Sequence, residues 1–412
     1  MNSTDLVPTH VRESEQEQYL YDHVAPSLSE LDLEIVRALP EGGNWRDLPP
    51  STTAKSSRLS RIVSSGGRTT YYGRLRWDAP SYTLNTYFYR PGNGSFVHPS
   101  QDRMITLREG ARLQSFPDEY RFLGGMVSVC RQIGNAVPPL LALAVGSMFP
   151  RGRVVDLFCG AGGLSTGLEW AGHEVVLACD KERMMCSTYS LNHPHTTIVR
   201  ADLGTEEGLC RTMRAVDEQL RGRTLHILAG GPPCQGYSTA GKWSLVDRRN
   251  ALAQTMVTCA SVLRPDHVLI ENVPGIIIQD GGSHLSRLVE GLKRAEYSVS
   301  ILTLKAEQYG VPQRRRRVFL VCCRENDAPD TPPPSFAPAP SRRARNRKRP
   351  APSDLPPPVT VRDAIGDLPP VESGGGLPVI EYNTGWISSE YQALMRGMVS
   401  VEQFKNREWT MN

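Results

Sequence analysis

The stretch that decides the fold reads Gly230-Gly231-Pro232-Pro233-Cys234-Gln235-Gly236-Tyr237-Ser238. Small apolar residues at 225–229 precede it and predict a buried strand, which two glycines and two prolines end abruptly. Because proline fixes φ and removes a backbone donor, this loop has few conformations and holds Cys234 at the strand end. Open α/β sheets place their chemistry at the carboxyl ends of strands. The stretch therefore predicts an α/β fold with a cysteine at its site.

A cysteine on its own is more often a small buried hydrophobe than a reactive group. Two other stretches favour reactivity. The apolar run 268–270 leads into Glu271 and then Pro274, and the basic run Gln313-Arg314-Arg315-Arg316-Arg317 leads into the apolar run 318–323. We therefore expect a thiol, a carboxyl and guanidinium groups at the ends of neighbouring buried strands.

Composition sets the outer limits. A chain of 412 residues with 39% hydrophobic content is long enough for about two domains with a real core. No apolar run reaches the ~18 residues of a membrane span, and residues 1–18 lack a signal-peptide core, so we expect a soluble, cytoplasmic protein. The nine cysteines show no metal-ligand spacing, which favours reduced thiols over disulfides and predicts no metal.

The positive charge is concentrated in one segment. Six basic residues at 342–349 exceed the formal net charge of +4, so the rest of the chain is slightly acidic. They lie within 328–358, where eleven of 31 residues are proline, a composition that disfavours helix and strand. Two interpretations stay open for this segment: a solvated linker, or an arm that contacts phosphates.

Five motifs together resemble those of the bacterial-type cytosine-5 DNA methyltransferases. They are 132–139 (QIGNAVPP), 156–163 (DLFCGAGG), 232–235 (PPCQ), 271–273 (ENV) and 313–317 (QRRRR). The resemblance covers about residues 60–323. Its motif order departs from the family, because the helix carrying Gly134-Asn135 usually closes the chain and here precedes the first strand, 153–158. The resemblance thus implies a circularly permuted order, which is feasible where chain termini lie close together.

The first strand, its glycine turn and the helix 164–171 have the order of a nucleotide site, in which glycines let the backbone approach the ligand. A second strand, 174–179, ends in Asp180, an acid suited to ribose hydroxyls, and Asp202 follows a third. By resemblance the ligand is S-adenosylmethionine, and Lys181 stands where an apolar residue often flanks the adenine in relatives. The resemblance implies these cofactor-binding residues: Phe158, Gly160, Gly162, Gly163, Asp180, Asp202, Pro232, Leu252, Asn135 and Val137.

The expected chemistry explains the residue types at the site. Cytosine C5 is a weak nucleophile, so a thiolate, Cys234, adds to C6 and leaves after methyl transfer. Glu271, protonated because burial raises its pKa, donates to N3. Arg317 and Arg315 hold the base carbonyl. A stacked base is out of reach, so the target cytosine flips out of the duplex at a cost of roughly a few kcal/mol.

Contacts to double-stranded DNA are expected from two regions. Residues 58–99 interleave arginines with aromatic residues, glycine and proline, which predicts short strands and a nucleic-acid surface. In the resemblance, 74–84 looks like the end of the target-recognition region, and 106–117 looks like its organising helix, with Glu109 and Arg112 structural. The loop after Cys234 is expected to close over DNA. The predicted DNA-binding residues are Gln235, Ser238, Arg74, Arg76 and Thr83.

The predicted fold is a Rossmann-like, three-layer α/β sandwich of the S-adenosylmethionine-dependent methyltransferase class, plus a small β-rich target-recognition domain. The sheet is mostly parallel with one antiparallel strand, expected at its edge. Single helices are expected over 19–39 and 130–149. The predicted divisions are 1–125 (recognition), 126–325 (catalytic), 326–358 (linker) and 359–412 (remaining recognition), so that both chain ends build one domain.

Three functions compete at this point. DNA cytosine-5 methylation is favoured. RNA methylation by the transfer-RNA branch is disfavoured, because that branch usually continues Pro-Pro-Cys-Gln with Pro-Phe-Thr, where this chain has Gly236-Tyr237-Ser238. A silent DNA-binding regulator is disfavoured by the presence of Cys234 and Glu271 together with the arginine run. The resemblance also suggests a cognate restriction endonuclease as partner.

Overall fold

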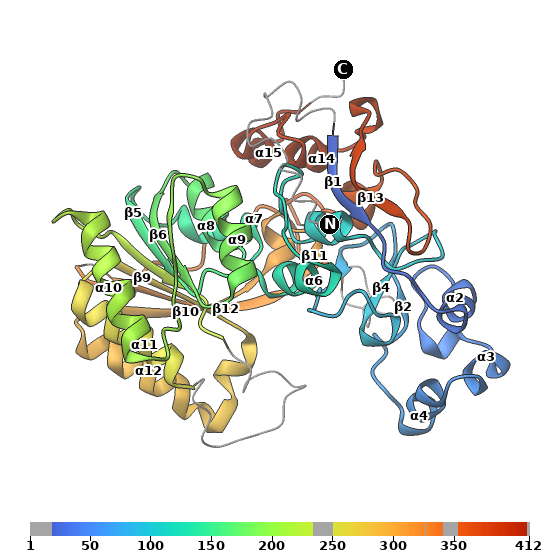
Figure 1. The fold of residues 1–412 in the computed structure, drawn as a ribbon, viewed down its shortest axis with the longest axis horizontal. Helices are drawn as coiled ribbons and strands as arrows, with labels where there is room; N and C mark the ends of the chain where they lie inside the picture. Colours follow the sequence, from blue (N-terminus) through green and yellow to red (C-terminus); the bar gives the residue numbers. More distant parts are fainter. Residues whose placement is uncertain (1–18, 234–249, 326, 341–352, 410–412) are drawn as a thin grey trace, which may run out of the picture.

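A seven-stranded sheet forms the centre of the larger part of the molecule (Figure 1). The computed structural model describes residues 19–233, 250–325, 327–340 and 353–409. The strand order is β10-β12-β9-β8-β5-β6-β7. The strands span Arg153–Leu157 (β5), Glu174–Asp180 (β6), Thr197–Arg200 (β7), Ile227–Gly230 (β8), His267–Asn272 (β9), Ser298–Lys305 (β10) and Arg316–Cys323 (β12).

Helices cover both faces of this sheet, which makes three layers. Alternate residues along β5 point to opposite faces, so Val154 and Val155 belong to two different apolar cores. One face packs against α7 (Pro139–Gly146) and α8 (Gly163–Trp170), with α9 (Arg183–Asn192) beside α8. The other packs against α10 (Glu206–Leu220), α11 (Asn250–Leu263) and α12 (Ser283–Arg294). The predicted three-layer α/β class is confirmed.

The single antiparallel strand lies inside the sheet rather than at its edge. β12 pairs antiparallel with both β9 and β10, whereas the pairs among β9, β8, β5, β6 and β7 are parallel. The prediction of one antiparallel strand is confirmed, but its expected edge position is wrong. β12 follows β10 along the chain, which predicts that the two strands pair. The sequence does not show that β12 lies between β10 and β9 in the sheet.

The smaller part of the molecule comprises the elements from β1 to α5 and from α13 to α15. Its segments come from both ends of the chain, because β1 (Tyr19–Val24) pairs antiparallel with β13 (Gly376–Glu381), with Leu20 opposite Ile380. The other elements are α2 (Glu30–Arg37), α3 (Pro50–Ala54), α4 (Ser57–Ser65), β2 (Gly73–Arg74), β3 (Ser81–Tyr82), β4 (Ser95–Val97), α5 (Leu107–Leu113), α13 (Val361–Ile365), α14 (Glu390–Met395) and α15 (Val401–Asn406).

The expected helix over 19–39 is wrong in its first third. Residues 19–24 form β1, whose partner strand is more than 350 residues away, and only α2 is helical. Ser29 caps α2 by accepting a hydrogen bond from the backbone of Asp32. The strand was missed because its pairing is non-local. The interleaved segment 58–99 does contain short strands, but α4 was also missed.

The expected helix over 130–149 is instead two helices. α6 spans Met126–Asn135 and ends there, because Pro138 and Pro139 cannot continue its hydrogen bonds and Pro139 begins α7. Asn135 is therefore the last residue of one helix rather than part of the first turn of another. Two helices of the larger part, α9 and α10, were not predicted.

Helix α5 is buried on every side and carries paired arginines into the core of the smaller part. Arg112 donates to Asp118 at 2.7 Å and to Asp367 at 2.6 Å, and Arg103 donates to Glu109 at 2.7 Å. All these side chains are 2% exposed or less. Arg112 and Glu109 are thus structural, as predicted. Asp367 comes from the segment after α13, so this cluster joins distant parts of the chain.

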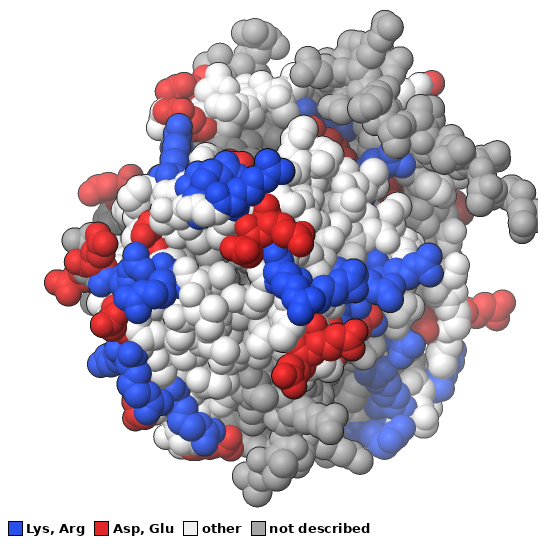
Figure 2. Space-filling view, turned by 60° about the vertical axis from the view of Figure 1, so that its left-hand side comes forward, with Lys and Arg blue, Asp and Glu red and all other residues white. Residues whose placement is uncertain are grey.

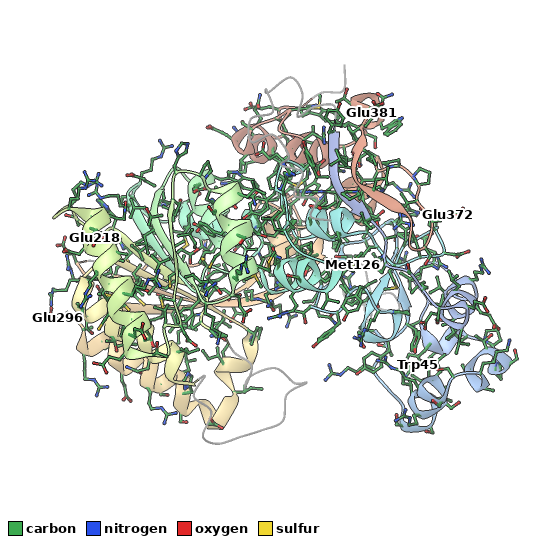
Figure 3. All side chains as sticks on the ribbon, viewed as in Figure 1. Trp45, Met126, Glu218, Glu296, Glu372 and Glu381 are labelled. Carbon is green, nitrogen blue, oxygen red and sulfur yellow. The ribbon has the colours of Figure 1, made fainter. Side chains whose placement is uncertain are left out.

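The surface carries mixed charges, with blue and red side chains interspersed over the face that includes the outer helices of the sheet (Figure 2). Glu218 and Glu296 lie at the outer end of the larger part, and Trp45 lies in the smaller part, with Met126 between them (Figure 3). Among the described residues, no helix is both long and apolar enough to cross a membrane.

Candidate active site

The glycine loop after β5 has one open side and one packed side. Gly160 has φ +56°, and a Cβ built there would meet no atom of the described residues within 4 Å. Gly162 has φ +99°, and a Cβ at Gly163 would lie 2.3 Å from the carbonyl oxygen of Val137, which is buried. The loop therefore needs glycine at 163 for close packing, whereas Gly160 leaves room for a ligand to approach the backbone.

Asp180, at the end of β6, holds the open side of this loop. Its Oδ2 accepts a hydrogen bond from the Gly160 backbone at 3.0 Å, and its Oδ1 accepts one from Glu182 at 2.8 Å. Burial raises the pKa of Asp180, and these backbone donors oppose the rise. Phe158, half-buried with φ +61°, directs the chain out of β5 beside it.

A second wall of the same edge comes from the ends of β7 and α11. A Cβ at Gly204 would lie 3.1 Å from Leu252 and 3.2 Å from Oδ1 of Asp202, so these two predicted residues are neighbours. The Lys181 ammonium lies 3.7 Å from Oδ2 of Asp202. Lys181, where relatives often have an apolar residue, thus places its positive charge beside Asp202. Asp202 is the residue predicted to accept from the adenine amino group. Asn135 is exposed at the end of α6.

Glu271 and Arg317 form an ion pair where β9 ends and β12 begins. Oε1 of Glu271 accepts from Nε of Arg317 at 2.7 Å, and both side chains are 11% exposed. Oε2 faces the cysteine loop, since it would lie 3.3 Å from a Cβ at Gly231. Burial raises the pKa of Glu271 although Arg317 and Arg315 oppose this. A carboxyl with one oxygen held and the other turned toward the loop is suited to donating a proton.

Arg315 contacts backbone carbonyl oxygens inside the fold. It is fully buried and donates to the carbonyl oxygens of Leu84 at 2.9 Å, Gly134 at 2.8 Å and Ala136 at 3.1 Å. Its two terminal guanidinium nitrogens donate to backbone acceptors, which favours a positioning role, and the expected contact with the base stays a prediction. It ties the start of β12 to the smaller part and to the end of α6.

The nucleophile itself lies outside the described residues, as do Gln235 and Ser238 and the predicted closing loop. Pro232, two residues before Cys234, is described and is buried. The basic run 342–349 also falls outside.

The predicted DNA contacts that are described divide into two kinds. Arg74 is buried and donates to the carbonyls of Val36, His98 and Gln101 and to Asp102, at 2.7–2.9 Å. Its two terminal guanidinium nitrogens thus donate inside the fold, which favours a structural role, and its expected contact with DNA stays a prediction. Thr83 is exposed, and its hydroxyl donates to the Arg314 carbonyl at 2.7 Å.

Arg76 is more exposed than Arg74, and both line a cavity that the sequence did not predict. Its guanidinium is 30% exposed and pairs with Asp78 at 2.5 Å. The cavity, about 350 Å³, is lined by Arg76, Tyr82 and Arg314 among others. Arg314 is not among the residues predicted to contact DNA, although it lies in the basic run 313–317.

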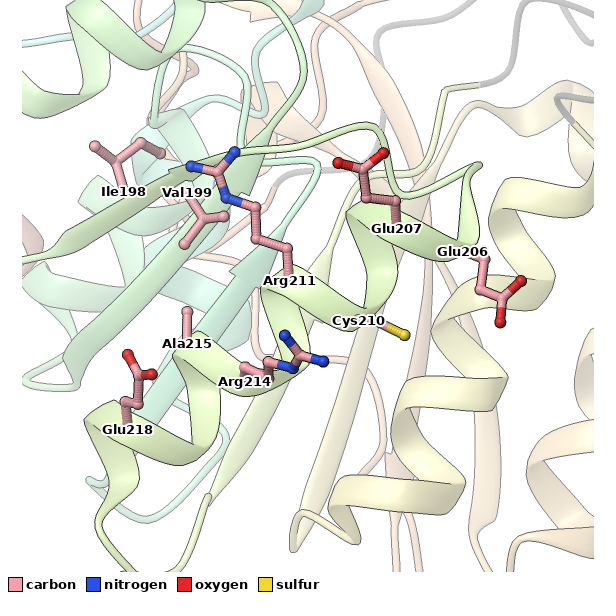
Figure 4. Close-up of a pocket in the computed structure, with 9 residues that line it drawn as sticks. All are labelled: Ile198, Val199, Glu206, Glu207, Cys210, Arg211, Arg214, Ala215 and Glu218. Atoms are coloured by element: carbon pink, nitrogen blue, oxygen red, sulfur yellow. The ribbon is translucent and has the colours of Figure 1, made fainter.

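A larger hollow of about 840 Å³ lies away from this edge, between the outer strand β7 and α10 (Figure 4). Its side chains include Glu206, Glu207, Arg211 and Arg214, with Cys210 among them. None of the predicted site residues that the structure describes lines it. Its ionic side chains lie on one exposed helix face, so we assign the chemistry to the sheet edge instead.

Comparison with known proteins defines the class. The family model for C-5 cytosine-specific DNA methylases matches residues 34–149 and 152–385, and the chain belongs to this family. The chain is 35% identical to Type II methyltransferase M.AgeI of Thalassovita gelatinovora, covering 60% of this chain and 58% of that protein. It is 32% identical to Type II methyltransferase M.XorII of Xanthomonas oryzae pv. oryzae, covering 58% and 50%.

The chain spans about half the length of these curated relatives. Among solved structures, a putative DNA modification methyltransferase encoded within a prophage of E. coli is 28% identical, with a TM-score of 0.42, covering 53% of this chain and 56% of that chain.

Proposed function

We propose that this protein transfers a methyl group from S-adenosylmethionine to C5 of a flipped-out cytosine in double-stranded DNA. One observation carries the proposal. The Glu271–Arg317 pair faces the residues that lead into Cys234, at the same sheet edge as a glycine loop with an open side. Membership of the C-5 cytosine-specific DNA methylase family supports the choice of base and of atom.

The residues at the sheet edge fit the cofactor. Gly160 leaves the loop backbone accessible, Asp180 would accept from the ribose, and Asp202 would accept from the adenine. Leu252 would lie near the methionine part of the cofactor. Phe158, Gly162, Gly163, Pro232, Asn135 and Val137 complete the proposed cofactor set. When bound, S-adenosylmethionine supplies the electrophilic methyl group.

The protein side chains then divide the work on the base. The Cys234 thiolate adds to C6, and Glu271 donates a proton to N3, so that the electron pair reaches C5. Arg317 orients Glu271 and stabilises negative charge on the base carbonyl. After methylation, the C5 proton is lost to a base, the Cys234–C6 bond breaks and N3 returns its proton to Glu271, which restores the aromatic ring, the thiolate and the protonated carboxyl. Arg315 acts as a positioning residue, through its bonds to three backbone carbonyls.

We also propose that the chain is circularly permuted. The Gly134-Asn135 helix precedes β5, and β1 pairs with β13, more than 350 residues later in the chain. These observations support a recognition domain built from 1–125 and 359–412, a catalytic domain at 126–325 and a linker at 326–358. A rearranged chain, with 152–412 followed by 1–149, should keep its activity; loss of activity in a folded product would contradict the proposal.

The proposed surroundings follow from this function. Duplex DNA is the substrate, with Arg76, Thr83, Gln235 and Ser238 as contacts, and the cytoplasm is the compartment. A cognate restriction endonuclease is proposed as partner, because the relatives named above are Type II methyltransferases.

Bisulfite sequencing tests the function directly. The chain is expressed in a host that lacks cytosine methylation, beside the Cys234→Ala variant as control. We expect methylation at one short motif with the natural chain and none with the variant. An unmethylated genome together with methylated transfer RNA would show that the substrate is RNA and would overturn the proposed DNA substrate. Methylation retained by Cys234→Ala would overturn the nucleophile assignment.

A further inference from the structure

The packed side of the glycine loop rests on a buried tyrosine and histidine that the mechanism does not use. The Tyr120 hydroxyl donates a hydrogen bond to the Ala161 carbonyl, in the middle of the loop. Burial raises the pKa of Tyr120, so the hydroxyl keeps the proton that it donates. Tyr120 is 4% exposed and His193 is 3% exposed. Neither side chain reaches the open side at Gly160.

His193 meets a hydrogen-bond acceptor at each ring nitrogen. Nδ1 lies 2.9 Å from a carboxylate oxygen of Glu169. Nε2 lies 3.2 Å from the Tyr120 hydroxyl and 3.5 Å from that of Thr166. Both hydroxyls give their protons to loop carbonyls, those of Ala161 and Gly162, so each presents a lone pair to the ring. Both ring nitrogens therefore lie within hydrogen-bond distance of the groups that surround the loop.

The fit between this pair and the loop is close. A Cβ built at Gly162 would lie 2.6 Å from both Nε2 of His193 and the hydroxyl oxygen of Tyr120. The loop backbone therefore lies directly on the two side chains and cannot retreat from the open side while they are in place.

Tyr120 is itself held by the smaller part and by α9. Arg108 of α5 donates to the Tyr120 carbonyl at 2.7 Å and to that of Pro117 at 2.9 Å. In the next residues, Asn192 of α9 bonds both backbone groups of Arg121, at 2.9 and 2.8 Å. The support thus runs from α5 through Tyr120 to the loop that faces the proposed cofactor.

We propose that Tyr120 and His193 are positioning residues that hold the glycine loop in its cofactor-binding shape and so set the affinity for S-adenosylmethionine. The proposal rests on the proposed function, since it concerns the cofactor of that site. Both residues act through Ala161 and Gly162 and touch neither the base nor the nucleophile loop in the described residues. Their loss should therefore weaken cofactor binding and leave the chemical step unchanged.

The test compares Tyr120→Phe with a matched variant, Tyr391→Phe. Tyr391 is also buried and also donates to one backbone carbonyl, that of Arg112, at 2.5 Å, but it lies in α14. The dissociation constant of S-adenosylmethionine is measured by calorimetry on the full chain, beside KM for the cofactor and kcat. Tyr120→Phe should raise the dissociation constant and KM on the order of tenfold, the size of one buried hydrogen bond, with kcat within about twofold. Tyr391→Phe should lower Tm by about as much as Tyr120→Phe does, but it should change neither the dissociation constant nor KM for the cofactor.

Equal cofactor affinity in Tyr120→Phe and the natural chain would overturn the inference, as would an equal loss in both tyrosine variants. A natural chain that binds no S-adenosylmethionine would instead overturn the proposed function, so the two failures are distinct.

His193 gives a second test that does not depend on the folding of Tyr120→Phe. His193→Leu should weaken cofactor binding. His193→Gln, whose amide can replace the Nε2 donor, should restore part of the affinity. No difference between His193→Leu and the natural chain would overturn the inference.

Discussion

Two arginine–carboxylate clusters in this molecule contain the same chemical groups but have different roles, one in the stability of the fold and one at the proposed active site. In the cluster around α5, Arg112 meets two aspartates, Asp118 and Asp367, and none of the three side chains is more than 2% exposed. Burial alone would raise the pKa of Asp118, but the charge of Arg112 reverses this and lowers it. At the sheet edge, Arg317 pairs with Glu271, the one carboxylate that it meets among the described residues, and burial raises the pKa of Glu271. A saturated cluster stabilises the fold, whereas an incomplete one leaves a carboxyl able to hold a proton.

The largest expected effect lies at the incomplete cluster. Glu271→Gln should reduce kcat by about 10²–10⁴-fold, because the amide can donate a hydrogen bond but cannot transfer a proton. In the natural chain, kcat should fall as pH rises through the raised pKa of Glu271, since the protonated form is the active one. That fall should be absent from the residual rate of the variant. Single-turnover methylation measured across pH checks both points.

Glu307 offers the matched control for this variant. It is 7% exposed, and burial raises its pKa too, but it lies in the short helix η5 (Ala306–Tyr309), and no catalytic role is proposed for it. Glu307→Gln should leave kcat within a few-fold. An equal loss in both variants would show that Glu271 has no special role.

The next effect lies at the saturated cluster. Arg112→Leu leaves Asp118 and Asp367 buried without their charge partner, which should lower the free energy of unfolding by about 3–5 kcal/mol. Arg264→Ala, which breaks an ion pair whose side chains are 57% and 67% exposed, should cost less than about 1 kcal/mol. Urea unfolding measures both. Equal losses would contradict the distinction between buried and exposed pairs.

These two clusters also show how far the sequence could be read. Motif spacing was enough to predict the α/β class, the strand ends that carry Glu271 and Asp180, and the structural role of Arg112. It could not separate Arg315 from Arg317, because two residues along one basic run differ only in which way each side chain points. Arg74 shows a related limit: an arginine among aromatic residues suggests a surface, and only the fold shows that its terminal guanidinium nitrogens donate to backbone carbonyls.

Contacts that cross the chain were the hardest to predict. The pairing of β1 with β13 and the support of the glycine loop by Tyr120 join segments whose local patterns carry no sign of each other. Likewise, nothing local shows that β12 inserts between β9 and β10.

A third buried carboxyl, Asp156 in β5, can be compared with Asp118 and Glu271, because burial raises its pKa as well. It is fully buried and accepts one hydrogen bond, from Ser165 at 2.7 Å, and burial raises its pKa to about 7. Because the folded pKa exceeds the unfolded one, its contribution to stability is complete below about pH 4 and is lost as pH rises through about 7. Asp156→Asn should lack this part of the pH dependence, a difference of a few kcal/mol at most. Thermal unfolding from pH 5 to 8 checks it, and parallel curves for the two proteins would contradict it.

The smallest effect separates two neighbouring arginines. Arg76→Ala should reduce the slope of log affinity for DNA against log salt by about one, if Arg76 leaves Asp78 to contact a phosphate. Arg74→Ala should instead lower stability and leave that slope unchanged in the folded protein, because its donors are used internally. Binding titrations at several salt concentrations decide between them. A reduced slope for Arg74→Ala would reverse the two assignments.

The pairing of β1 with β13 constrains how the protein can fold during translation. Tyr19 lies opposite Glu381, so the first strand leaves the ribosome about 350 residues before its partner exists. At roughly 5–20 residues per second, that is a wait of tens of seconds, during which the complete seven-stranded sheet has already been synthesised. The nascent chain can therefore complete the sheet first, while an unpaired strand edge stays available to chaperones or to wrong partners until translation is nearly over.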